Sequence, residues 1–186
     1  MHTIHLPEKT QVAAMQTKKS YGPSDIWINK DLELPSYPFT KVFKGFDRVE
    51  AVRRIFGTRT HQVLSRLRVL LYSSRWGGYL WIDDKKGALV VNLHYLKTGR
   101  KKYVYLDVIH ELVHIKQHMD GRALFDERYG YVDRPTEIEA YKEAVKEADK
   151  IGMSRKEIVD YLKVEWVNSS DFKRLLKAVG LNGKDT

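Results

Sequence analysis

Val104-Tyr-Leu-Asp-Val-Ile-His-Glu-Leu-Val-His-Ile-Lys-Gln-His-Met119 is the most informative stretch of this sequence. When it is wound into a helix at about 100° per residue, its side chains separate into two stripes. The wider stripe is apolar apart from Lys116 and contains Tyr105, Val108, Ile109, Leu112, Val113, Ile115 and Met119. The opposite stripe contains Asp107, His110, Glu111, His114 and His118, with Gln117 at its edge. Polar faces of surface helices are usually rich in Lys, Glu, Gln and Arg, so a face of histidines and acids indicates a chemical site.

Within this helix, His110-Glu111-x-x-His114 matches the HExxH pattern. Histidines at i and i+4 stand one turn apart on the same face, so both imidazoles can bind one metal ion. The Glu111 carboxylate lies beside them and can take a proton from a metal-bound water. Five-letter patterns also arise by chance on surface helices, but the apolar flanks favour a site. The sequence therefore predicts His110 and His114 as metal ligands and Glu111 as the catalytic base.

A catalytic zinc ion usually has three protein ligands and a water, so a third ligand is needed. His118 lies two turns from His110, too far to reach the same ion on a straight helix, and is expected near the site or at the surface. Asp120 follows His114 by six residues, where the metzincin pattern has its third ligand. That pattern needs a glycine where this chain has Gln117, which disfavours Asp120.

Glu137 and Glu139 are the other candidates, on a helix expected over residues 135–150. A helix separates them by about 160°. Glu137 heads the apolar stripe of Ala140, Tyr141, Ala144, Val145 and Ala148, whereas Glu139 falls among lysines. If Thr136 is the N-cap, Glu139 is also its capping-box partner. An inward carboxylate is costly unless it is paired or binds a metal, so Glu137 is the predicted third ligand.

An HExxH helix followed by a glutamate on a later helix resembles the gluzincins, the His-His-Glu branch of the zincin metallopeptidases. The likeness covers about residues 88–150, and the Glu137-x-x-Ala140 surroundings resemble those of ImmA/IrrE-type peptidases, in which Asp or Asn often follows the alanine; here Tyr141 follows it. The resemblance implies an α+β, zincin-like fold, with an active-site helix pair on a small antiparallel sheet. It also implies an edge strand that orients an extended peptide, and the run 88–95 is placed to be that strand.

The expected function is thus hydrolysis of peptide bonds in a protein or peptide substrate, with Zn²⁺ as cofactor. Tyr129, Tyr131 and His94 are candidates for the donor that stabilises the oxyanion. An alternative hypothesis is a metal-binding scaffold without hydrolysis. The presence of Glu111 disfavours it, because a structural site needs no base.

Charge is distributed unevenly along the chain, which has a net charge of +9. Residues 41–105 carry fifteen basic and four acidic side chains, net +11, whereas residues 1–40 are neutral and residues 106–186 carry fourteen against sixteen, net −2. The basic segment 41–105 is either a solvated face or a surface for nucleic acid. The second interpretation makes the protein a nucleic-acid-associated one with a regulatory or vestigial zincin site.

Length and composition suit one domain with additions. The chain has no cysteine, which excludes disulfides and thiolate zinc sites, and it shows neither a signal core nor an apolar run that could span a membrane, so a soluble cytoplasmic protein is expected. Three regions are expected: an extended N-terminal arm over residues 1–40 pinned by Ile26, Trp27 and Ile28, a catalytic domain over residues 41–152, and a helical extension over residues 153–186.

Local patterns predict the remaining elements. Further helices are expected from Asp47 to Gly57 with a capping box at Asp47 and Glu50, over residues 60–72, from Ser154 with a second capping box at Glu157, and over residues 170–179. Strands are expected over residues 79–83 and 88–95, joined as a hairpin by residues 84–87.

Overall fold

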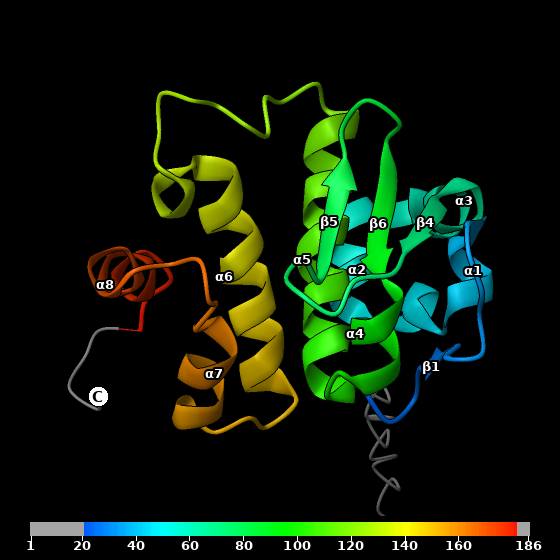
Figure 1. The fold of residues 1–186 in the computed structure, drawn as a ribbon, viewed down its shortest axis with the longest axis horizontal. Coiled ribbons are helices and arrows are strands. Elements are labelled where there is room, and N and C mark those ends of the chain that lie inside the picture. Colours follow the sequence, from blue (N-terminus) through cyan, green and yellow to red (C-terminus); the bar gives the residue numbers. More distant parts are fainter. Residues whose placement is uncertain (1–20, 182–186) are drawn as a thin grey trace, which may run out of the picture.

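A computed structural model describes residues 21–181 of the chain, so the first half of the expected N-terminal arm lies outside the described residues. Figure 1 shows helices packed on a small sheet. The strands are β1 (Trp27–Ile28), β2 (Ser36–Pro38), β3 (Phe43–Lys44), β4 (Arg68–Tyr72), β5 (Leu80–Asp83) and β6 (Ala88–Asn92). The helices are α1 (Phe39–Val42), α2 (Glu50–Phe56), α3 (Thr60–Arg66), α4 (Leu93–Thr98), α5 (Lys101–Met119), α6 (Pro135–Lys150), α7 (Arg155–Leu162) and α8 (Ser169–Ala178), with 3-10 turns η1 (Phe46–Arg48), η2 (Gly57–Arg59) and η3 (Tyr131–Asp133).

The main sheet has four strands in the order β2-β4-β6-β5, and β1 pairs separately with β3. The α+β class is confirmed, but the expectation of an antiparallel sheet is wrong. β4 and β6 run parallel, with Val69 opposite Leu89, while β2–β4 and β5–β6 are antiparallel. The sheet is therefore mixed. The hairpin between β5 and β6 was correctly predicted, and Gly87 at its turn has a φ of 57°.

The helix expected over residues 60–72 ends at Arg66, and the rest of the run forms β4. Apolar residues from Leu67 onward also alternate with period two, because Val69 and Leu71 are buried and Arg68 is exposed. A short apolar run fits both periods, and the pairing partners on β2 and β6 decide for the strand.

The expected edge strand over residues 88–95 is interior instead. β6 lies between β4 and β5, and all five of its residues are buried. The chain leaves the sheet at Asn92, whose side chain caps α4, so that His94 lies exposed on that helix. The edge of the sheet nearest to α5 is therefore β5, whose outer side pairs with no other described strand.

Helix α5 lies between the sheet and α6, and Figure 1 shows α5 and α6 side by side. Residues 104–106 and 108–115 of α5 are all buried, so this helix forms the centre of the molecule. Asp120 and Gly121, with φ of 74° at Gly121, end it as predicted. The loop of residues 120–134 then returns the chain to α6.

Helix α6 covers the predicted range, with Pro135 at its first turn, where the missing amide hydrogen costs nothing. Its N-cap is Arg134, so the expected capping box of Thr136 with Glu139 does not form. The capping box of Ser154 with Glu157 at α7 is present as predicted. Side chains from α7 and α8 join the same apolar core as α5, and the proposed division into three regions stays a prediction.

In the N-terminal part of the structure, the expectation that a helix starts at Asp47 is wrong. Asp47 belongs to η1, and α2 begins at Glu50 without a side-chain cap, because Gly45 with φ of 91° first turns the chain. Ile26 and Ile28 are buried and fix the arm as expected, whereas Trp27 is 46% exposed.

Among residues 21–181, no helix combines the length and the apolar character that crossing a membrane requires.

Candidate metal centre

The HExxH residues on α5 meet at one point. His110 and His114 are one turn apart and both buried, and their Nε2 atoms lie 3.0 Å from each other. If each ring carries its proton on Nδ1, the two Nε2 lone pairs point toward one shared partner.

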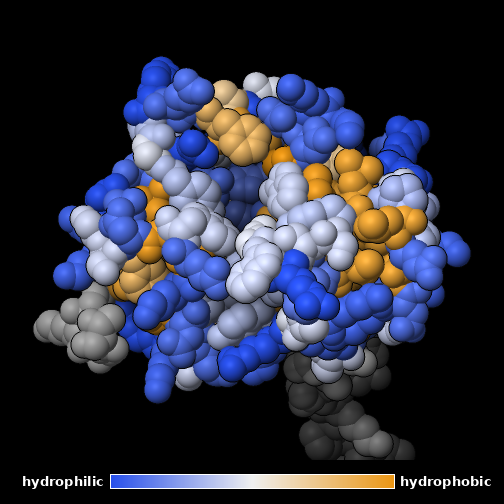
Figure 2. Space-filling view, viewed as in Figure 1, coloured by the Kyte–Doolittle hydropathy of each residue, from blue (hydrophilic) through white to orange (hydrophobic). Residues whose placement is uncertain are grey.

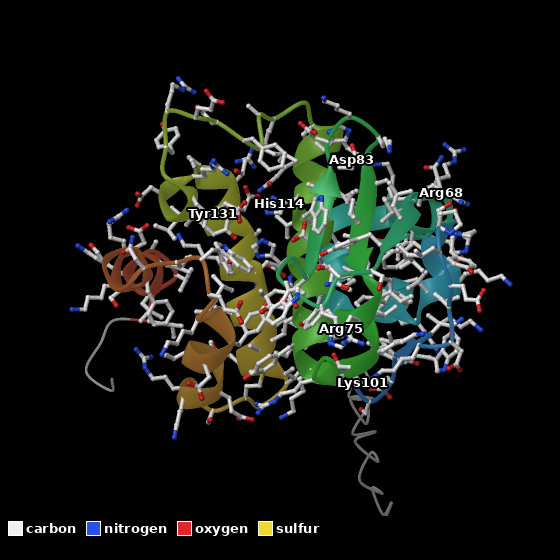
Figure 3. The ribbon with its side chains drawn as sticks, in the orientation of Figure 1. Arg68, Arg75, Asp83, Lys101, His114 and Tyr131 are labelled. Atoms are coloured by element: carbon white, nitrogen blue, oxygen red, sulfur yellow. The ribbon has the colours of Figure 1, made fainter. Side chains whose placement is uncertain are left out.

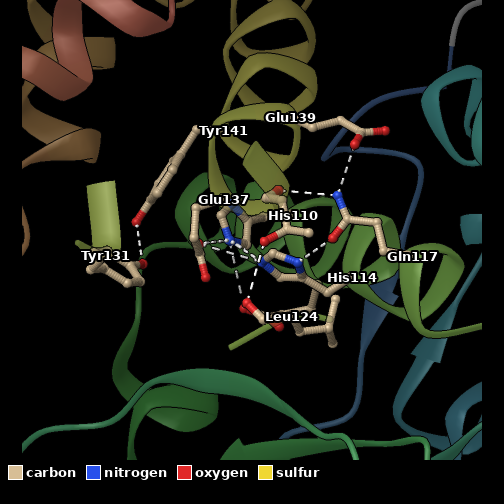
Figure 4. A network of polar contacts seen from close by, with 10 residues as sticks. His110, His114, Gln117, Leu124, Tyr131, Glu137, Glu139 and Tyr141 are labelled. Carbon is tan, nitrogen blue, oxygen red and sulfur yellow. Dashed lines mark hydrogen bonds and ion pairs between the residues drawn. The ribbon is translucent and has the colours of Figure 1, made fainter. Parts of the chain in front are cut away.

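Glu137 reaches the same point from the first turn of α6. Its Oε2 atom lies 3.4 Å from Nε2 of His110 and 3.5 Å from Nε2 of His114 (Figure 4). The structure thus brings together the two histidines and the acid that the sequence analysis selected, all buried, with ligand atoms within 4.8 Å of one another. Glu139, two residues away, points to a different place and is an exposed residue.

The electrostatics of the cluster are those of a buried site that holds positive charge. Burial opposes ionisation of Glu137, but hydrogen bonds with His110 and His114 hold the pKa of Glu137 well below its usual range. Burial lowers the pKa of His110. Burial also disfavours the charged form of His114, yet its hydrogen bond with Glu137 raises the pKa of His114 to about 9.

The three ligand atoms fit a tetrahedral zinc ion. Ligands at about 2.0–2.2 Å from zinc lie about 3.3 Å from one another, and the observed separations are 3.0, 3.4 and 3.5 Å. Oε2 of Glu137 is buried without a hydrogen bond of regular geometry, as is Oε2 of Glu111. A divalent cation would satisfy Oε2 of Glu137 together with the two imidazoles, and the donor set of two imidazoles and one carboxylate is typical of catalytic zinc.

Glu111 lies beside the cluster rather than in it. Its carboxylate is buried, and its Oε1 atom is 4.0 Å from Nε2 of His110. Burial raises the pKa of Glu111 to about 8, mainly because the charged form loses its hydration. A carboxylate with this proton affinity, next to a metal-bound water, is suited to accept a proton near neutral pH.

Gln117 is a functional residue that the sequence analysis missed. Its Oε1 can only accept, so Nδ1 of His114, 2.7 Å away, must carry the proton and leave Nε2 free for a metal. Its amide nitrogen donates to the carbonyl of Thr136 at 3.1 Å and to Glu139 at 3.0 Å. Gln117 therefore links the orientation of His114 to the start of α6. The signal in the sequence was its place three residues after His114, on the same side of the helix.

Tyr141 takes the place at which the resemblance expects Asp or Asn. Its ring packs edge-on against His110, with centroids 4.4 Å apart, and its hydroxyl lies 2.9 Å from that of Tyr131. His110 is thus positioned by an aromatic contact, and its Nδ1 has no hydrogen-bond partner within residues 21–181.

The remaining candidates lie elsewhere. Asp120 pairs with Lys116, and Glu139 pairs with Arg122, so neither approaches the cluster. His118 is half-buried against Gly87 of the hairpin. Of the three candidate oxyanion donors, Tyr131 lines the pocket at the cluster, whereas Tyr129 and His94 do not.

A pocket of about 360 Å³ opens above the cluster. Figure 2 shows it as a hollow with a hydrophilic floor, and Figure 3 shows His114 in the space between α5 and α6. One wall comes from β5 and the residues before it, the other from α6 and the loop 120–134. The wall residues are mostly apolar and aromatic and include Tyr79, Leu80, Trp81, Ile82, Leu124, Phe125, Tyr131 and Trp166.

Comparisons with protein families, with curated proteins and with solved structures find no match to this chain. The buried cluster of His110, His114 and Glu137 is thus a candidate metal site on two packed helices.

Proposed function

We propose that the protein is a zinc-dependent peptidase of the gluzincin type. The observation that carries the proposal is the meeting of His110, His114 and Glu137 at separations of 3.0–3.5 Å, with Glu111 buried beside them. His110, His114 and Glu137 would hold the ion. Bound there, zinc supplies a nucleophilic water at neutral pH and polarises the scissile carbonyl.

The side chains around the cluster have separate tasks in this proposal. Glu111 takes the proton of the water and later gives it to the leaving amine. Gln117 fixes the tautomer of His114, and Tyr141 fixes the ring of His110. Tyr131, which lines the pocket, is the best-placed oxyanion donor among the residues expected for that task.

The free edge of β5 supports a peptide as substrate. β5 lines the pocket through Leu80, Trp81 and Ile82, and its outer side pairs with no described strand. An extended peptide can bind such an edge through main-chain hydrogen bonds and so pass over the cluster. This role, expected for residues 88–95, is now proposed for residues 80–83.

The test combines metal analysis with a hydrolysis assay. Wild type and Glu111→Gln are each expected to contain one zinc per chain, because Glu111 is not a ligand. Glu111→Gln is expected to lose about 10²- to 10⁴-fold in rate, as for removal of a general base. His110→Ala/His114→Ala is expected to bind no zinc, and full occupancy in that variant would refute the site. Hydrolysis by Glu111→Gln at the wild-type rate would refute the mechanism.

A second proposal is that the basic segment 41–105 forms a surface that binds nucleic acid. Of the fifteen cations in residues 41–105, only Arg54, Lys86 and Lys102 form ion pairs with other described residues. Arg59 and Arg66 line a cavity of about 360 Å³ together with His118, away from the metal cluster. Cations at a surface that form no ion pair attract phosphates. The metal cluster does not explain the surplus of positive charge in residues 41–105.

A further inference from the structure

The charges that line the active-site pocket are few. Apart from the cluster and Glu111, Arg134 is the one charged side chain among the described residues that line it. With zinc bound, the ion, two carboxylates and two neutral imidazoles sum to zero charge. The positive charge of Arg134 is then left without compensation in a pocket whose other walls are apolar and aromatic.

Arg134 has no partner for this charge within residues 21–181. It forms no ion pair there, and its Nε is buried without a hydrogen-bond partner. Asp126, whose pKa the charge of Arg134 helps to lower, already accepts hydrogen bonds from Nε and Nη2 of Arg128. A buried guanidinium N–H without an acceptor is unfavourable, so the arrangement suits an acceptor brought by a ligand.

The side chain of Arg134 is nevertheless held in place. Its guanidinium carbon lies 6.0 Å from the ring centroids of both Phe125 and Tyr131, within the range of cation–π attraction. Its backbone forms the N-cap of α6, three residues before Glu137. Arg134 is therefore positioned before any substrate arrives, at the end of the helix that carries the third ligand.

We propose that Arg134 binds a carboxylate of the peptide substrate and makes the enzyme selective for peptides with an anionic group close to the scissile bond. The inference rests on the proposed peptidase function. A guanidinium matches a carboxylate through two parallel hydrogen bonds, and an apolar setting strengthens that pair. The carboxylate belongs either to the C-terminus of the peptide, which implies carboxypeptidase-like action, or to an Asp or Glu side chain.

Three N-acetylated decapeptide libraries of neutral residues distinguish these sources. The first has a free C-terminal carboxylate, the second is amidated, and the third is amidated with one glutamate placed at each position in turn. We expect wild type to cleave the first or the third with about 10- to 100-fold higher kcat/KM than the second. Arg134→Gln is expected to remove this preference, and Arg134→Lys to keep only part of it.

Lys142→Gln is the control for the loss of one positive charge, since Lys142 lies on α6, is exposed and does not line the pocket. Zinc content is measured in every variant, so that damage to Glu137 is detected separately. Binding of the same libraries to zinc-loaded Glu111→Gln, by calorimetry, gives a readout that does not need hydrolysis.

The outcomes separate the two proposals. Carboxylate-dependent binding that is lost in Glu111→Gln/Arg134→Gln supports the inference even if no library is hydrolysed, a result that would count against the peptidase proposal. Hydrolysis or binding without preference for a carboxylate, an equal loss on all libraries in Arg134→Gln, or no binding of any library overturns the inference.

Discussion

Gln117 shows how much one side chain outside the ligand set contributes. It accepts a hydrogen bond from His114 and donates to Thr136 and Glu139, so it connects the two helices at the height of the cluster. Gln117→Ala is expected to weaken zinc binding about 10- to 100-fold, because His114 loses its fixed tautomer and orientation.

The measurement for Gln117→Ala is competition for zinc against a chromogenic chelator. Lys116→Ala is the control, since Lys116 is the neighbour of Gln117 on α5 but pairs with Asp120, and within residues 21–181 its side chain forms no hydrogen bond or ion pair with His114. Equal affinity in Gln117→Ala and wild type would show that the hydrogen bond does not support the ligand.

Glu137 and Glu139 provide a second test at this scale. Glu137→Gln is expected to lose zinc and activity, because an amide is a much poorer ligand than a carboxylate. Glu139→Gln is expected to keep both within a few-fold, because the amide oxygen can still accept from Gln117. Zinc analysis of both variants checks this, and an exchange of the two results would mean that α6 begins elsewhere in solution.

Asp107 gives a prediction about pH. Burial raises the pKa of Asp107 to about 6 from 3.8, although Tyr95 and Tyr161 hydrogen-bond to it and act in the opposite direction. The folded protein therefore holds this proton more tightly than the unfolded chain. The free energy of unfolding falls as pH rises from about 4 to about 6, by on the order of 3 kcal/mol for this group.

Asp107→Asn is expected to be free of this loss, so its stability relative to wild type should rise over the same pH interval and stay constant above it. Urea unfolding of both proteins at a series of pH values, with chelator present, measures the difference. A difference that does not change with pH would contradict the prediction.

Among the elements, α5 and α6 show where sequence patterns suffice. Their length and strong periodicity identified both, and the helical wheel separated Glu137 from Glu139. For two other segments the prediction was wrong, and the reasons are physical. The run 60–72 is short and apolar with both periods, and strand β4 depends on partners distant in sequence. Residues 88–95 were expected to be an edge strand, but whether a strand lies at an edge depends on β4, and the residues of β4 were expected to belong to a helix. Gln117 was overlooked because two of its three partners, Thr136 and Glu139, become neighbours only when α5 and α6 pack.

The packing of α5 on α6 includes a buried side-chain hydrogen bond. The hydroxyl of Tyr105 on α5 donates to Glu147 on α6 at 2.7 Å. The Glu147 side chain is fully buried, and its Oε2 has no hydrogen bond within residues 21–181, with Nζ of Lys150 4.0 Å away. Tyr105→Phe leaves this carboxyl without its donor, so we expect a loss of about 1–3 kcal/mol in the free energy of unfolding. Tyr103→Phe, on the same helix, is the control in urea unfolding. Equal changes in the free energy of unfolding for the two variants would argue against a stabilising role of the Tyr105–Glu147 hydrogen bond.

For the whole molecule, the surplus of positive charge leads to a prediction about salt. Figure 3 shows Arg68 at some distance from Arg75 and Lys101, so binding of nucleic acid is expected to depend on general charge rather than on sequence. The affinity for duplex DNA should fall steeply as salt rises, and Arg59→Glu/Arg66→Glu should reduce the logarithmic slope by about 2. Lys102→Glu, whose lysine already pairs with Glu157, is the control in fluorescence anisotropy. Absence of binding at low salt would leave the surplus as a solvated face.

The position of the ligands on both sides of the loop 120–134 has a consequence for the lifetime of the chain. A metal held by α5 and α6 acts as a cross-link that closes this loop, and the free energy by which it stabilises the native state grows with the logarithm of its concentration above Kd. Removal of the metal by a chelator should therefore accelerate tryptic cleavage after Arg122 and Arg128, and mass spectrometry of the fragments would show it. Metal supply would then decide how long the protein survives among proteases.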